Sequence, residues 1–116
     1  MIELIYGDMQ PEQLANLILA LLKNSENIVV ISSDLSHFHN LNEANTLDES
    51  CLKAVATLDL EEFKKGCEAC GLIGIKAIIL ASKELKISSK LLDYRTSYDA
   101  SGDKSSVVGY MSAMFY

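Results

Sequence analysis

The densest group of side chains able to do chemistry lies in residues 32–39, which read Ser-Ser-Asp-Leu-Ser-His-Phe-His. It contains both histidines of the protein, His37 and His39, together with the carboxylate of Asp34. Neutral imidazole is a common metal ligand, and a neighbouring carboxylate can fix its tautomer and orientation. The group therefore fits a metal site. A polar loop whose Ser and Asp side chains cap the next helix, with solvent-exposed histidines, fits the same residues.

The cysteines form a second candidate group. Cys67 and Cys70 are separated by two residues, and this spacing fits half a zinc site, a redox pair or two small apolar residues on neighbouring turns. Cys70 is the better placed, because a thiol just ahead of a helix N-terminus is favoured as the thiolate that binds metals. Cys51 lies on an apolar helical stripe and is expected in the core. An odd count of three cysteines without a secretory signal favours reduced thiols over disulfides.

These residues need elements to position them. Residues 2–6 have strand character, and residues 28–31 form a β-branched run typical of a strand buried on both faces. Between them, Pro11 opens an apolar pattern of helical period that ends near Asn24. We expect a β-α-β unit with residues 32–39 just beyond its second strand, where open α/β sheets bind ligands.

The remainder predicts three further helices and two strands. Capping-box spacings at Thr46 and Asp59 predict two consecutive helices that meet near Asp59. A further helix is expected to start near Gly74, so that Cys70 would lie just ahead of it. Residues 87–94 and 107–115 have strand composition. Altogether the pattern predicts an α/β fold with a mixed sheet flanked by helices.

Composition limits the class of protein. A chain of 116 residues with 49% hydrophobic and 22% charged residues suits a single domain or half-domain over residues 1–116. The net charge of −6 repels polyanions and argues against nucleic-acid binding. The apolar run at residues 17–22 is too short to span a bilayer, and no targeting signal precedes it. A cytoplasmic protein with no membrane role is expected.

Several short motifs together match a known family. They are Ser32-Ser33-Asp34-Leu35-Ser36-His37-Phe38-His39, Glu43-Ala44, Leu47-Asp48, Cys70-Gly71, Leu91-Leu92-Asp93-Tyr94, Ser101-Gly102-Asp103 and Val107-Val108-Gly109-Tyr110. In this order they resemble the C-terminal portion of Memo-like proteins, whose bacterial and archaeal members are often called AmmeMemoRadiSam system protein B.

The resemblance implies a fold similar to that of the class III extradiol dioxygenases, which use non-haem iron. It also implies a metal-dependent, dioxygenase-like redox pocket that holds iron or copper. Cys70 matches the cysteine of the family's metal pocket, and His37 matches the histidine of its S-S-D-x-x-H motif. These two are the expected catalytic and metal-binding residues, with Asp34, Ser36 and His39 around them.

The chain also departs from the family pattern. Family members are more than twice as long, and two pocket histidines from their first half have no counterpart here. With His37 and Cys70 alone, a metal would have fewer than the three protein ligands that such sites normally need. The chain alone is therefore expected to be inactive and to need the missing N-terminal half or a partner chain. An alternative is a non-enzymatic interaction module, since a truncated α/β fold exposes apolar surface and favours homo-oligomers.

Overall fold

The computed structural model describes residues 1–116, the whole of the printed sequence. The elements in chain order are α1 (Pro11–Leu22), β1 (His37–His39), α2 (Leu41–Thr57), the 3-10 helix η1 (Leu60–Lys65), α3 (Leu72–Leu85), β2 (Ser89–Thr96), α4 (Tyr98–Ser101) and β3 (Val107–Phe115).

The sheet has three strands in the order β1-β3-β2, and both pairings are antiparallel. β2 and β3 form a long hairpin that is paired from Ser89 opposite Phe115 to Thr96 opposite Gly109. The short strand β1 pairs with the start of β3 on its other side. The α/β class and the two C-terminal strands are confirmed. The sheet is antiparallel throughout rather than mixed, because the two N-terminal segments do not pair as strands.

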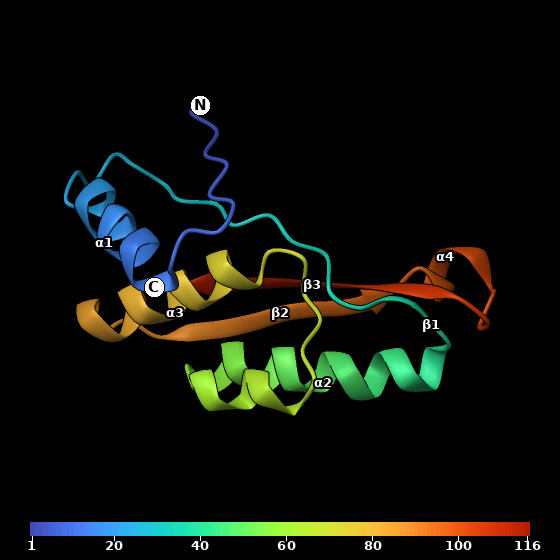
Figure 1. Ribbon diagram of the computed structural model, residues 1–116. Helices are drawn as coiled ribbons and strands as arrows, with labels where there is room; N and C mark the ends of the chain where they lie inside the picture. The colour runs from blue at the N-terminus through green and yellow to red at the C-terminus, as the bar shows by residue number, and fades with distance from the viewer.

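The helices lie in two groups around the hairpin (Figure 1). α2 packs along β2 and β3, whereas α1 packs against α3. α2 begins earlier than its expected start at Thr46, because the Asn40 side chain caps it by accepting the Glu43 N–H at 3.0 Å. The Thr46 hydroxyl instead donates to the Asn42 carbonyl within the helix.

The next two helix starts lie close to their predicted positions. The Asp59 side chain accepts the Glu61 N–H at 2.9 Å and caps η1, which confirms Asp59 as the N-cap, although the bond goes to Glu61 and no capping box with Glu62 forms. α3 begins at Leu72 with Gly71 as its N-cap, two residues before Gly74. Cys70 therefore lies just ahead of a helix N-terminus, as predicted.

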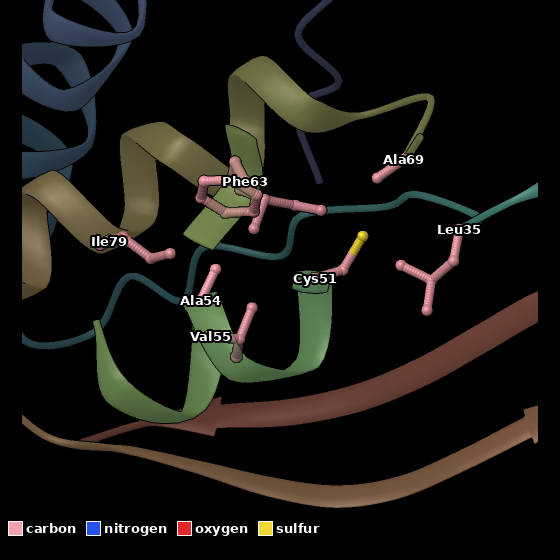
Figure 2. Close-up of a cluster of buried hydrophobic side chains, with 8 residues drawn as sticks. Leu35, Cys51, Ala54, Val55, Phe63, Ala69 and Ile79 are labelled. Atoms are coloured by element: carbon pink, nitrogen blue, oxygen red, sulfur yellow. The ribbon is translucent and has the colours of Figure 1, made fainter. Parts of the chain in front are cut away.

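A core of eight buried residues joins α2, η1 and α3. Figure 2 labels Leu35, Cys51, Ala54, Val55, Phe63, Ala69 and Ile79 within it. Two members come from loops that carry candidate site residues: Leu35 follows Asp34, and Ala69 precedes Cys70. Burial of these apolar neighbours fixes both loops against the same core.

The expectation of three reduced thiols is wrong for two of them. Cys51 of α2 and Cys67 of the loop after η1 form a disulfide, with their Cα atoms 5.1 Å apart. This separation lies within the usual range for such a bond. Cys70 is free and exposed. Because the Cys67 sulfur is already bonded to Cys51, Cys67 and Cys70 do not act here as a pair of thiolate ligands.

The two N-terminal strand predictions are also wrong. Residues 2–6 and 28–31 are extended but belong to no strand, and the first residues of the chain reach away from the helices (Figure 1). Residues 28–33 make no backbone–backbone hydrogen bond. Ile28 and Val30 are 87% and 82% exposed. Val29 and Ile31 of the same segment pack against the core, but this chain provides neither a neighbouring strand nor an apolar layer over Ile28 and Val30.

Candidate functional site

Two of the predicted site residues, Cys70 and His37, each contact Asp34. The backbone N–H of Asp34 donates to Cys70 Sγ at 3.3 Å, and the Cys70 N–H donates to the Asp34 carbonyl oxygen at 3.2 Å. On its other side, the Asp34 carboxylate oxygen Oδ2 lies 3.3 Å from His37 Nε2. Asp34 therefore holds the thiol of Cys70 through its backbone and the imidazole of His37 through its side chain.

Ser33 adds a second contact between the Asp34 loop and the start of α3. Its hydroxyl Oγ accepts the Gly71 N–H at 2.8 Å and lies 3.6 Å from Cys70 Sγ. A Cβ added at Gly71 would lie 2.6 Å from the Ser33 Cβ, so only glycine permits this approach. The start of α3 and residues 33–34 are thereby held in direct contact.

The site is open to solvent. The side chains of His37 and Asp34 are 32% and 48% exposed, and Cys70 is exposed as well. The arrangement thus presents an accessible thiol, an imidazole and a carboxylate at one end of the sheet.

His39 belongs to a separate contact. Its Nε2 lies 2.7 Å from Glu68 Oε2, and its Nδ1 lies 3.7 Å from Glu43 Oε2. The hydrogen bond to Glu68, followed by the charges of Glu68 and Glu43, raises the pKa of His39 above its ordinary value of 6.5. Because Glu68 stands between Cys67 and Cys70, His39 ties the loop that carries the thiol to the end of β1.

Ser36 is fully buried, unlike its neighbours in the loop. Its N–H donates to Oδ1 of Asp48 on α2 at 2.9 Å, whereas its own Oγ has no hydrogen-bond partner. Ser36 therefore contributes to the site through its backbone. The sequence predictions missed Asp48 and Glu68. Asp48 had a detectable signal, since a carboxylate three residues before Cys51 lies on the apolar stripe of its helix.

The residues present fit only part of a metal site. Cys70 and His37 are suitable ligand types for iron or copper, and the Asp34 carboxylate can orient the imidazole. No group of three or more His, Cys, Asp or Glu side chains is arranged to hold a metal ion. A complete site would thus need ligands from outside these 116 residues.

Comparison with known proteins identifies the family of this chain. The sequence profile described as Memo-like protein matches residues 3–114, nearly the whole chain. The chain belongs to the Memo-like family. A MEMO1 family protein of Nitrosopumilus maritimus is 31% identical over 110 residues, covering 90% of this chain and 40% of the relative. A MEMO1 family protein of Methanobrevibacter smithii is 39% identical over 107 residues, covering 83% of this chain and 38% of the relative.

This Memo-like chain spans only part of its relatives. The share of each curated relative that it covers ranges from 33% to 43%. More than half of each relative's polypeptide therefore has no counterpart among these residues. Within the described chain, no helix combines the length and apolar character required to cross a membrane.

Proposed function

We propose that this chain supplies Cys70 and His37 to one wall of a metal-dependent redox pocket that uses iron or copper. The contact of both residues with Asp34 supports the proposal, because a thiol and an imidazole from distant parts of the sequence each bind the same residue. Asp34 orients the imidazole, the backbone of Ser36 fixes the loop, and His39 restrains the segment that bears the thiol.

The other wall comes from the remaining polypeptide of a Memo-like protein, corresponding to the part of the relatives that this chain does not cover. Two observations support this assignment. No group of three potential ligands is present in this chain, so a metal bound by Cys70 and His37 would have open coordination positions. In addition, the extended residues 28–33 have free backbone groups, and burial of such groups requires hydrogen-bond partners.

The surface for that polypeptide is an apolar groove. It has a volume of about 450 Å³ and runs between residues 28–31 and the end of β3 at Met111 and Phe115, above Ile75 and Ile78 of α3. Ile28 and Val30 line this groove and are 87% and 82% exposed. A patch of this kind is typical of a surface that another polypeptide covers.

Calorimetric titration of the purified chain with iron(II) or copper tests the ligand assignment. Binding that Cys70→Ala abolishes and His37→Ala weakens is expected. Glu49→Gln, which changes an exposed carboxylate of α2 that is paired with Lys53 and lies outside the site, serves as the control and retains binding. Binding that persists in Cys70→Ala, or no binding by the wild type, would remove the metal role from this chain.

A non-enzymatic interaction module is the second candidate, and the exposed Ile28 and Val30 favour it. In that case the groove binds the rest of a Memo-like polypeptide without any redox chemistry. Dioxygen uptake by the assembled protein with a reductant or a catechol-like substrate separates the two functions. Uptake that depends on Cys70 supports the redox pocket, and absence of uptake supports the interaction module.

Sedimentation tests the surface itself. The double variant Ile28→Asp, Val30→Asp is expected to stay folded, since both side chains are exposed, and to lose association with the complementary polypeptide. Leu92→Asp on β2 is the matched control, because Leu92 is exposed and lies outside the groove. Self-association of the wild type that survives the double variant would show that the chain uses a different surface.

A further inference from the structure

Asp48 is a fully buried carboxylate in the middle of α2. Its Oδ1 accepts the Ser36 N–H at 2.9 Å, and its Oδ2 accepts the Tyr94 hydroxyl at 2.7 Å. Burial, and then the bond to Asp48, raises the pKa of Tyr94 far above its ordinary value, so the hydroxyl remains a donor at neutral pH. A buried carboxylate needs such partners, and hydrogen bonds to a charged group are among the stronger ones in proteins.

Ser36 is held from two sides. While Asp48 binds its N–H, the Gly109 N–H of β3 donates to its carbonyl oxygen at 3.0 Å. The Gly109 carbonyl in turn accepts the Leu35 N–H at 2.9 Å. A Cβ at Gly109 would clash with the Asp48 carboxylate oxygen Oδ2, so this close packing of α2 on β3 requires glycine.

Ser36 lies in the sequence between Asp34, which contacts Cys70, and His37. Ser36 is adjacent to His37 and two residues after Asp34, whose N–H donates to Cys70 Sγ. Movement of Ser36 away from α2 would move the His37 ring and the Asp34 N–H together. A single buried carboxylate thus binds the backbone of the residue that lies between His37 and Asp34.

We propose that Asp48, oriented by Tyr94, is a positioning residue that fixes the segment from Asp34 to His37 and thereby sets the spacing of His37 and Cys70. This inference rests on the proposed function for its significance. The carboxylate itself does not reach the pocket, because it is fully buried beneath the loop.

Asp48→Ala is the main test, with Asp48→Asn as the conservative variant and Glu49→Gln as the matched control. Glu49 is the next residue of α2, exposed and paired with Lys53. Two readouts are taken on the intact chain at one pH: amide hydrogen exchange of residues 34–37, and the alkylation rate of Cys70, the one free thiol.

In Asp48→Ala, exchange of the Ser36 amide is expected to become about tenfold faster or more, since it loses a bond to a charged acceptor. The alkylation rate of Cys70 should also differ from the wild-type rate, because the Asp34 N–H no longer binds the sulfur in the same geometry. Asp48→Asn keeps an oxygen acceptor and should restore both rates most of the way. Glu49→Gln should match the wild type. A role limited to global stability would change exchange throughout α2 and β3 and leave Cys70 alkylation unchanged under folded conditions.

Wild-type rates at both positions in a folded Asp48→Ala protein would overturn the proposal. If that variant does not fold, Tyr94→Phe takes its place, because it removes the donor to Oδ2 and leaves the carboxylate present. Wild-type rates in Tyr94→Phe would then overturn it. Neither readout uses a metal. If the wild-type chain binds no iron or copper, that result contradicts the proposed function. The positioning role of Asp48 is still decided by the exchange and alkylation rates.

Discussion

Asp34 and Cys70 exchange two hydrogen bonds although 36 residues separate them: Asp34 N–H to Cys70 Sγ at 3.3 Å, and Cys70 N–H to Asp34 O at 3.2 Å. The backbone bond fixes the distance between the two loops. The bond to sulfur fixes the direction in which the thiol points. This double contact is what turns two separate sequence motifs into one site.

Gly71→Ala should disrupt that contact. The added Cβ would lie 2.6 Å from the Ser33 Cβ and 2.9 Å from the Ser32 carbonyl oxygen, and both neighbours belong to the opposing loop. Overpacking of this kind costs about 1–3 kcal/mol. A lower urea midpoint and an altered alkylation rate of Cys70 are expected.

Gly102→Ala is the control for this prediction. No atom lies within 4 Å of a Cβ added there, although the φ of +72° is unfavourable for alanine. It should lose some stability, about 1 kcal/mol from the left-handed backbone, and leave Cys70 alkylation unchanged. A Gly71→Ala protein with wild-type midpoint and alkylation would mean that the two loops are not in close contact.

The Cys51–Cys67 disulfide should stabilise the fold in oxidising buffer. Its 16-residue sequence separation corresponds to about 3 kcal/mol in the loop-entropy account. Cys51→Ser should therefore lower the free energy of unfolding in urea by about that amount, and added reductant should have a similar effect on the wild type. Cys70→Ser is the control and should keep the response to reductant. Finding three alkylatable thiols per unfolded, unreduced chain would contradict the pairing.

Gly109→Ala should reveal the packing between β3 and α2. The new methyl group would collide with the Asp48 carboxylate, and we expect a loss of about 1–3 kcal/mol in the free energy of unfolding. In an Asp48→Ala background the carboxylate is absent, so Gly109→Ala should lower the free energy of unfolding by less. Urea denaturation of the four proteins in this double-mutant cycle measures the coupling. Strict additivity would show that the glycine is not required by the carboxylate.

Local patterns predicted the elements that are stabilised by their own neighbours in sequence. Apolar residues at helical period placed α1 and α3, and strand composition placed β2 and β3 close to their observed bounds. The position of Cys70 just ahead of α3 followed from the same patterns. These predictions succeed because helix periodicity and hairpin pairing are short-range properties.

Long-range contacts account for what the sequence could not predict. Residues 28–31 have the composition of a buried strand, but strand formation depends on a neighbour that these residues lack. The Cys51–Cys67 pairing depends on how η1 folds back on α2. The contacts of Asp48 with Ser36 and Tyr94 likewise join three distant segments. Each of these contacts depends on the folded arrangement of the chain and cannot be read from the spacing of residues in the sequence.

The His39–Glu68 contact predicts a pH-dependent contribution to stability. Its hydrogen bond raises the pKa of His39 above 6.5, so the folded state holds this proton more tightly than the unfolded state does. The contribution is therefore fully present below about pH 6.5 and is lost as the pH rises through the folded value. NMR titration of the His39 ring should show the raised pKa, and Glu68→Gln should return it toward 6.5.

Glu43→Gln is the matched control. Glu43 lies farther from the ring, at 3.7 Å, so this substitution should lower the pKa of His39 less than Glu68→Gln does. Urea denaturation on both sides of the transition completes the test. The wild type should exceed Glu68→Gln in stability at about pH 5.5, and the difference should shrink at about pH 9, where His39 is neutral in both folded and unfolded chains. A difference that stays constant across this range would mean that the stabilisation does not depend on protonation of His39, and that Glu68 holds the Cys70 loop by another contact.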